Sequence, residues 1–235
     1  MGQPKDTPSL EGEAIEIVSA TRLDAATFLA EAPLGLSLSR FSPDRRIQSR
    51  IFSDNAQGLP VVYNAAIDRT DGPDIVVFVH DDVWIEDIFL VERLIGALGN
   101  FDIVGVAGNT RRTRGQAAWY LDPDAIRWDF PHLSGAIVGR KPFGGINRFG
   151  SVPLACQSLD GVFLATRRST LRRARVRFDT RFDFHFYDLD FCRAAGRAGL
   201  SLGTWPIVLA HRSEGNFESV AWERMRDVYF EKWGA

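Results

Sequence analysis

Short runs of apolar residues along the chain alternate with segments in which apolar residues recur every three or four positions. The runs are typical of buried strands, and the recurring spacing is typical of amphipathic helices. Because strands and helices take turns, the pattern predicts an α/β fold with a mostly parallel central sheet flanked by helices. Strands are expected at 14–20, 34–39, 46–53, 75–79, 101–107, 134–138, 158–165 and 202–209, and helices at 24–31, 58–69, 86–98, 169–174, 188–198 and 220–233.

The segment 109–150 interrupts this alternation, because arginines, aromatic residues and glycines replace the regular apolar runs. We expect an irregular insert of loops and short strands there. Residues 1–12 are polar and predict a flexible tail. The remaining chain, 13–235, has the length of one large domain, which can bury roughly 70–75% of its unfolded surface.

The composition is that of an ordinary globular protein, with 45% hydrophobic and 25% charged residues. A net charge of −2 argues against a nucleic-acid partner. No apolar run reaches the ~18 residues that a membrane span needs. The two cysteines, Cys156 and Cys192, match neither a disulfide framework nor a zinc spacing, which favours a reducing, cytoplasmic compartment.

An imidazole and two carboxylates, His80, Asp81 and Asp82, directly follow the strand 75–79. Ligands of open α/β sheets bind beyond the carboxyl ends of the strands, so these side chains stand where chemistry commonly occurs. Alternate side chains of an extended segment share a face, which puts His80 and Asp82 on one side and Asp81 on the other. Imidazole and carboxylate together suit a divalent metal. Solvated acids at a strand end are the alternative.

Two later positions offer partners for this group. His211 follows the apolar strand 202–209, and beside Asp82 it would be a second metal ligand. Asp188 and Asp190 stand at the start of a helix, where carboxylates cap free N–H groups. One carboxylate satisfies that structural role, which leaves the other for general-base chemistry.

The order of these motifs resembles the family 2 glycosyltransferases of the GT-A fold, in particular a bacterial branch whose metal motif reads H-x-D instead of D-x-D. The resemblance extends over about 14–233 and implies a single GT-A-like domain, with its nucleotide-binding half at about 13–109 and its acceptor-binding half at 110–235. The matching segments are 55–64, 79–82, 159–164, 187–192 and His211.

The resemblance implies a role for each matching residue. Asp82, with His211 and His80, would hold Mn²⁺ or Mg²⁺, and Asp188 would deprotonate the acceptor hydroxyl in an inverting displacement. The residues implied near the nucleotide are Thr21, Arg22, Asn55, His80 and Asp81, and those implied near the sugar or acceptor are Asp160, Gly161, Tyr187, Asp190 and Arg111.

The chain departs from the family pattern at three places. His80 replaces the first Asp of the metal motif, and Tyr187 replaces the Glu that usually precedes the catalytic Asp. Ser39 and Arg40 replace an acidic signature that commonly binds uracil, so the donor base stays open. These changes keep a non-catalytic glycan- or nucleotide-binding module as an alternative. A sugar nucleotidyltransferase is disfavoured, because 18–22 is not the Gly-rich loop of that class.

The partners implied are a nucleotide-sugar donor and a hydroxyl acceptor, either a glycan or a lipid-linked molecule, in bacterial glycan or cell-surface synthesis. An arginine-rich run over 167–181 is either a solvated helix face or a contact with an anionic membrane surface at the inner face. Arg111, Arg112 and Arg114 either bind phosphate or lie in a solvated loop. The helix 220–233 either covers the core or pairs with another subunit, so the oligomeric state stays open.

Overall fold

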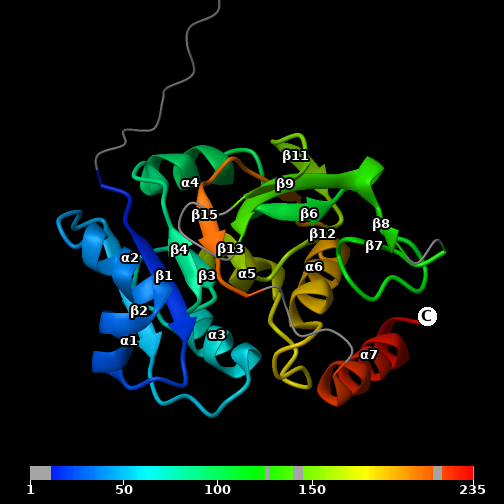
Figure 1. Cartoon of the computed structure of the whole chain (residues 1–235), viewed down its shortest axis with the longest axis horizontal. Helices are drawn as coiled ribbons and strands as arrows, with labels where there is room; N and C mark the ends of the chain where they lie inside the picture. Colours follow the sequence, from blue (N-terminus) through cyan, green and yellow to red (C-terminus); the bar gives the residue numbers. More distant parts are fainter. Residues whose placement is uncertain (1–11, 125–126, 140–144, 214–218, 235) are drawn as a thin grey trace, which may run out of the picture.

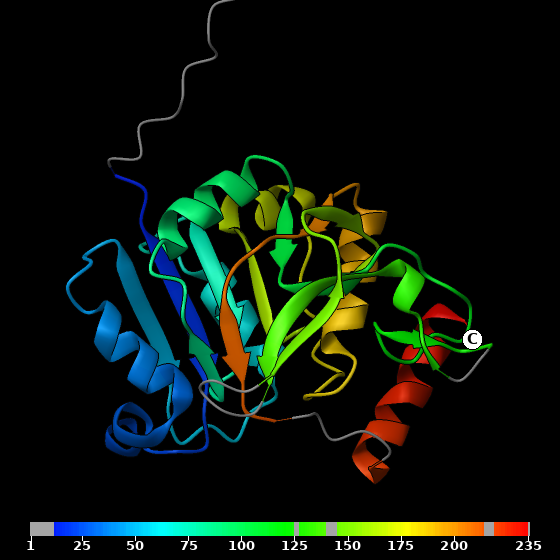
Figure 2. The same ribbon diagram turned by 45° about the horizontal axis from the view of Figure 1, so that its top comes forward.

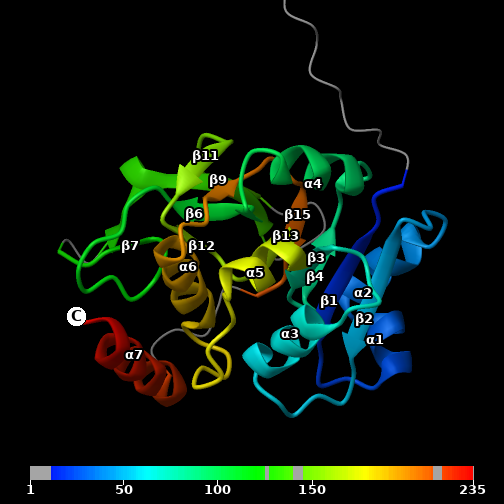
Figure 3. The same cartoon turned by 180° about the vertical axis from the view of Figure 1, so that it is seen from behind.

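The computed structural model describes residues 12–124, 127–139, 145–213 and 219–234 (Figure 1). The expected tail therefore lies outside the described residues, except for Gly12. Two sheets form the centre of the molecule, and seven helices among the described residues surround them (Figures 1 and 3). The α/β class predicted from the sequence is confirmed.

The main sheet is mixed but largely parallel. Five of its seven strands run in one direction, whereas β13 and β11 run against them. The strand β3 lies in the middle of this sheet with all five residues buried, as the unbroken apolar run predicts. In spatial order the strands are β11 (Leu154–Cys156), β14 (Leu202–Thr204), β5 (Ile103–Gly105), β13 (Phe163–Arg167), β3 (Ile75–Val79), β1 (Ile15–Ala20) and β2 (Ile47–Phe52).

A second sheet, which the sequence did not predict, lies beside the first. Figure 2 shows β15 (orange) next to β9 (light green), the pair on which this sheet is centred. In spatial order its strands are β12 (Ser158–Leu159), β6 (Ala107–Asn109), β9 (Leu133–Gly139), β15 (Leu209–His211) and β4 (Val83–Ile85), with β10 (Ile146–Gly150) paired to β9.

Three strands expected to be continuous are each divided between the two sheets, which corrects the prediction. The run 101–107 breaks at Val106 into β5 and β6, and 158–165 breaks at 160–162 into β12 and β13. The run 202–209 is interrupted at 205–208, between β14 and β15. At each break the chain leaves the main sheet for the second sheet or enters from it. The breaks at Val106 and 205–208 lie within apolar runs, so the pattern of the sequence did not reveal them, whereas the break at 160–162 begins with Asp160 and Gly161.

The insert 109–150 contains the short strands that were expected. Its clearest predicted strand, 134–138, is β9, and β10 pairs with it. A separate two-stranded ladder joins β7 (Leu121–Asp122) to β8 (Arg127–Trp128), and a 3₁₀ turn (Phe130–His132) follows. Figure 1 shows this ladder on the side of the molecule opposite β1 and β2.

The segment 34–39 is helical, not the strand that its alternating leucines and serines suggested. Pro33 stands in the first turn of the helix, where its missing N–H costs nothing. Leu34 is fully buried while Leu36 is 41% exposed, so the apolar side that contacts the core follows helical spacing. The helices are α1 (Ala25–Glu31), α2 (Pro33–Phe41), α3 (Leu59–Asp68), α4 (Leu90–Leu98), α5 (Arg168–Ala174), α6 (Tyr187–Arg197) and α7 (Val220–Trp233).

The helices cover the two sheets from several sides. Helix α3 packs on β1, α4 on β13 and β5, α2 on β4, and α6 on β12. The terminal helix α7 covers the core, because Tyr229 is buried against Phe186 and the indole N–H of Trp233 donates to Asp190. None of the helices in the described part of the chain is long and apolar enough to cross a bilayer.

Much of the arginine-rich run has partners inside the protein. The guanidinium of Arg168 is buried and pairs with Glu16 of β1. Arg172 donates to the carbonyl oxygens of Ile67, in the last turn of α3, and of Arg69, which follows it. These bonds hold α5 against the end of α3. They give these arginines a structural role, and the membrane contact stays a prediction.

Candidate functional site

The ends of two strands bring the predicted metal ligands together. Strand β3 ends at Val79, and the chain turns through His80, Asp81 and Asp82 into β4. Strand β15 pairs antiparallel with β4 so that His211 lies opposite Val83. This register places His211 beside Asp82, although 129 positions separate them in the sequence.

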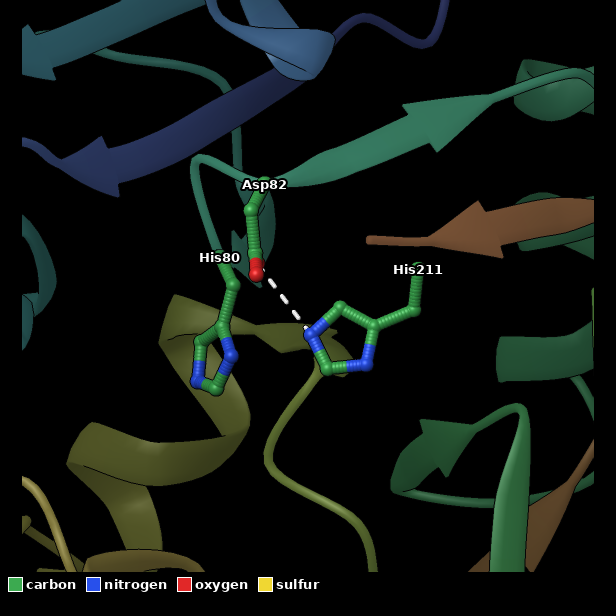
Figure 4. A group of neighbouring side chains, drawn as sticks. All are labelled: His80, Asp82 and His211. Carbon is green, nitrogen blue, oxygen red and sulfur yellow. Dashed lines mark ion pairs between the residues drawn. The ribbon is translucent and has the colours of Figure 1, made fainter. Parts of the chain in front are cut away.

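His80, Asp82 and His211 form a compact group of three side chains. Figure 4 shows the three side chains pointing toward one another, His80 and Asp82 from the turn after β3 and His211 from β15. The Nε2 atom of His211 is 3.1 Å from Oδ1 of Asp82, and the ring centroids of His80 and His211 are 6.0 Å apart. One ligand atom from each residue lies within 4.8 Å of the others.

The electrostatics of this group favour an ionised carboxylate. Burial disfavours the charge of Asp82, but the hydrogen bond from His211 and the nearby imidazoles outweigh it and hold the pKa of Asp82 well below its usual range. Burial lowers the pKa of His80. Burial also opposes the charge of His211, but Asp82 raises the pKa of His211 overall.

This donor set fits a divalent metal. Two imidazoles, which bind a metal in their neutral form, and one carboxylate offer two nitrogen donors and one oxygen donor, which suits a transition metal such as Mn²⁺ better than Mg²⁺. The hydroxyl of Ser213 lies 3.2 Å from Nε2 of His211. The alternative of solvated acids at a strand end does not describe Asp82, whose side chain is only 16% exposed.

Asp188 is held at the start of α6 by two backbone amides. Its Oδ2 accepts from the N–H of Gly161 at 3.0 Å, and its Oδ1 accepts from the N–H of Leu189 at 2.9 Å. The preceding Phe186 has φ +65°, a left-handed conformation that is uncommon for an aromatic residue. Phe186 keeps this conformation while it is buried against Trp222 and Tyr229. The sharp turn there directs Asp188 toward the turn between β12 and β13.

The Asp188 carboxyl is suited to accept a proton near neutral pH. Burial, assisted by the negative charge of Asp160, raises the pKa of Asp188 to about 7. A base whose pKa lies near the working pH is available in its ionised form and still binds the proton that it removes.

A cavity of about 1100 Å³ connects these groups. His80, His211, Asp160, Gly161 and Asp188 contribute to its wall, so the metal group and the candidate base face one space. The remaining lining residues are mostly aromatic or small: Ala117, Ala118, Trp119, Tyr120, Trp128, Phe130, Ile137, Gly139, Gly145, Asn147, Arg148, Phe149, Phe184, His185, Phe186, Tyr187, Leu189, Ser213 and Trp222.

Of the residues expected near the nucleotide, Thr21 and Arg22 follow the end of β1, Asn55 follows the end of β2, and Asp81 follows the end of β3. The N–H of Asn55 donates to the carbonyl of Thr21 at 2.9 Å, and Thr21 is buried whereas Arg22 is exposed. The backbone carbonyl of Asp81 accepts a hydrogen bond from the N–H of Leu34 in α2. In the described part of the chain these four residues lie outside the cavity wall. Their role toward a nucleotide stays a prediction.

Two residues expected near the acceptor have structural partners inside the protein, and their role toward an acceptor stays a prediction. Asp190 is buried, and its Oδ1 accepts from Trp233 at 2.7 Å and pairs with Lys232 at 2.6 Å. Arg111 donates to both carboxylate oxygens of Asp129 at 2.8 Å. Neither residue is part of the described cavity wall. Asp190 thus anchors α7 through Trp233 and Lys232, whereas Asp188 is the carboxylate that accepts from backbone amides and faces the cavity.

The aromatic part of the cavity wall was missed from the sequence. Trp119, Tyr120, Trp128, Phe130 and Phe149 all come from the insert 109–150. The feature that could have indicated this part of the wall is the high number of aromatic residues in a segment without helical or strand periodicity. The sequence showed that density but not that the rings meet.

Comparison with known proteins shows similarity at the level of the fold. No family model and no curated protein matches the sequence. Among solved structures, GalNAc-T7 with UDP, GalNAc and Mn²⁺ has a TM-score of 0.53 at 10% identity, covering 94% of this chain and 48% of that one. The catalytic domain of Drosophila β1,4-galactosyltransferase 7 with xylobiose has a TM-score of 0.50 at 10% identity, covering 92% and 80%.

A mannosyltransferase from Pyrobaculum calidifontis, in complex with GDP-Man and Mn²⁺, has a TM-score of 0.50 at 14% identity and covers 96% of this chain and 64% of that one. These identities are too low to assign an activity. The chain thus has an α/β fold similar to that of the GT-A glycosyltransferases.

Proposed function

We propose that this protein transfers a sugar from a nucleotide-sugar donor to a hydroxyl acceptor, with inversion at the anomeric carbon. The observation that carries the proposal is the single cavity shared by His80, His211 and Asp188. A metal group and a base near pKa 7 on one cavity suit a displacement at a sugar carbon. The structural neighbours in complex with UDP or GDP-Man and with Mn²⁺ support a nucleotide-sugar donor and a metal ion, and the inversion rests on Asp188 alone.

In this mechanism Asp188 accepts the proton of the acceptor hydroxyl. The hydroxyl oxygen forms a bond to the anomeric carbon as the bond from that carbon to the diphosphate breaks. His80, Asp82 and His211 would hold a Mn²⁺ or Mg²⁺ ion, which when bound neutralises negative charge on the departing diphosphate. Because the acceptor attacks directly, no enzyme nucleophile is needed.

The cavity also provides groups that orient the two substrates. The N–H of Gly161 holds the Asp188 carboxylate, and Asp160 beside it is placed to accept hydrogen bonds from sugar hydroxyls. We assign the acceptor to the aromatic part of the cavity wall. The proposal includes a role in bacterial glycan or cell-surface synthesis, which the sequence resemblance implies. Cytoplasmic location and contact with the inner membrane surface belong to the same proposal.

A donor panel with UDP-, GDP-, dTDP- and CMP-sugars and Mn²⁺ tests this function. We expect turnover of one donor, a loss of at least about 100-fold in Asp188→Asn, and a similar loss in Asp82→Asn. Asp227→Asn is the matched control, because Asp227 is exposed on α7 and pairs with its neighbour Arg226. Full transfer by Asp188→Asn, or nucleotide binding with no turnover of any donor, would contradict the assignment.

A further inference from the structure

Four aromatic rings in the insert form a near-parallel group, here called the aromatic platform: Tyr120, Trp128, Phe130 and Phe149. The Trp128 ring is at its centre. It lies 4.5 Å from Tyr120, 5.6 Å from Phe130 and 5.7 Å from Phe149, with interplanar angles of 27°, 17° and 22°. Two of the four rings remain accessible, since Trp128 is 42% exposed and Phe130 is 59% exposed.

The platform is supported by a buried ring beneath it. Trp119 is only 7% exposed and meets Tyr120, Trp128 and Phe149 nearly edge-on, at interplanar angles of 85°, 79° and 79°. Edge-to-face contacts are favourable for aromatic rings and restrict their tilt. The platform is therefore a preformed surface and not a set of independent side chains.

An ion pair between the partly exposed Arg111 and the buried carboxylate of Asp129 fixes the chain that carries Trp128 and Phe130. Asp129 stands between them and is 3% exposed, and its carboxylate accepts from Arg111 and from the side chain of Asn109 at 3.1 Å. With Asp129 directed inward, its two neighbours in the sequence lie on the opposite side of the chain. Arg111 is thus a positioning residue for the platform.

The platform shares the cavity with the candidate base, and polar groups stand beside it. Tyr120, Trp128, Phe130 and Phe149 line the same cavity as Asp188. Asn147 and Arg148 of β10, next to Phe149, line it as well. The Asn147 amide and the Arg148 guanidinium supply hydrogen-bond donors, and the Asn147 oxygen supplies an acceptor, at the edge of the aromatic platform.

We propose that the platform binds a pyranose ring of a saccharide acceptor. A pyranose has flat C–H faces that stack on aromatic rings, and hydroxyl groups around its edge that need hydrogen-bond partners. The platform offers the faces, and Asn147 and Arg148 offer the partners. An alkyl chain would use the apolar surface but form no hydrogen bonds with Asn147 and Arg148, whereas sugar hydroxyls can. This inference rests on the proposed function for its acceptor role, although saccharide binding can be measured alone.

Substitutions at Trp128 distinguish stacking from general apolar contact. The probes are cello-, xylo- and maltohexaose and, separately, dodecylphosphocholine, each titrated by calorimetry and ligand-observed NMR with and without Mn²⁺ and nucleoside diphosphates. We expect at least one saccharide to bind the wild type. The saccharide affinity of Trp128→Tyr should stay within about twofold of the wild-type value, and that of Trp128→Leu should be about tenfold lower. Phe130→Ala should weaken binding as well, and its exposed position keeps folding intact.

Phe89→Ala is the matched control, because Phe89 is 57% exposed but lies outside the described cavity wall. Retained saccharide binding by Trp128→Leu, binding of dodecylphosphocholine alone, or no saccharide binding by the wild type would each overturn the proposal. Metal-dependent binding of a nucleoside diphosphate by the wild type is measured in parallel. If the wild type binds the nucleoside diphosphate but no saccharide, only the proposed saccharide binding by the platform is contradicted. If it binds a saccharide but no nucleoside diphosphate, only the proposed transferase function is contradicted.

Discussion

The Nε2 atom of His80 lies 2.9 Å from the hydroxyl oxygen of Tyr187. That hydroxyl donates its only hydrogen to the carbonyl oxygen of Gly161 at 2.8 Å, so it accepts from His80. Nε2 therefore carries the proton in the neutral imidazole, and Nδ1 keeps the free lone pair. Tyr187 thus selects the tautomer in which Nδ1 of His80 is available to a metal.

The two residues of this bond are two of the positions at which the sequence departs from the glycosyltransferase pattern. His80 stands where an Asp is usual, and Tyr187 stands where a Glu is usual. A carboxylate at position 80 could bind a metal through either oxygen. An imidazole at that position binds a metal only through the nitrogen that carries no proton, so its tautomer matters. The two departures are compatible because the Tyr187 hydroxyl fixes the tautomer of His80.

Tyr187→Phe should weaken Mn²⁺ binding by about tenfold, because removing a hydrogen-bond partner of a metal-binding His typically lowers the affinity by that order. Calorimetry of Mn²⁺ binding measures the effect without any turnover. Tyr229→Phe is the control, since Tyr229 is equally buried but packs on Phe186 and not on His80. Equal Mn²⁺ affinity in wild type and Tyr187→Phe would show that the bond does not position His80.

The metal group should prefer Mn²⁺ over Mg²⁺ by about tenfold or more, because two of its three donors are imidazole nitrogens. Titration of the protein with each ion, in the absence of nucleotide, gives the ratio. His211→Asn should reduce the Mn²⁺ affinity more than the Mg²⁺ affinity. Mg²⁺ binding as tight as Mn²⁺ binding would argue that the histidines are not ligands.

The transfer rate should rise with pH and level off above about 7, the pKa to which burial and Asp160 raise the Asp188 carboxyl. Only the ionised carboxylate accepts a proton, so each unit below that pKa lowers the rate about tenfold. Asp160→Asn removes the neighbouring negative charge and should move the midpoint to lower pH. A midpoint that does not move when Asp160 is neutralised would exclude Asp188 as the titrating group.

Asp188→Asn should raise the thermal stability at pH 8 although it removes activity. The pKa of Asp188 is about 7 in the folded protein and 3.8 in its ordinary state. The free energy of unfolding therefore falls as the pH rises from about 4 to 7, and above pH 7 the folded protein carries an unfavourable buried charge. Asparagine removes that charge and still accepts from an amide. We expect Tm to rise by roughly 2–4 °C per kcal/mol gained, with little change at pH 4. A lower Tm at pH 8 would contradict this.

Gly161→Ala should disrupt the site, because a Cβ there would collide with the Tyr187 hydroxyl and lie 2.9 Å from Cβ of Asp188. We expect weaker Mn²⁺ binding and a loss of transfer together. Gly196→Ala in α6 is the matched control, since a Cβ at that position meets nothing within 4 Å and alanine favours a helix by about 1 kcal/mol over glycine. Normal Mn²⁺ binding by Gly161→Ala would show that the close packing is not required.

The sequence by itself determined the individual elements that carry the chemistry. The apolar run of β3 and the polar residues after it located His80 and Asp82, and the helix start at 187–190 located Asp188. These features depend on neighbours a few positions away, so local pattern is sufficient to predict them. The alternating leucines and serines of α2 are the exception, since a helix buries Leu34 where a strand was expected.

Only the tertiary structure decided which elements meet. The pairing of β4 with β15 puts Asp82 beside His211, and the ion pair of Arg111 with Asp129 turns Trp128 and Phe130 toward the cavity. The second sheet, the Tyr187–His80 bond and the aromatic platform also join segments distant in the sequence. Such contacts depend on strand register and side-chain packing across the whole core, and neither leaves a periodic signal in the chain.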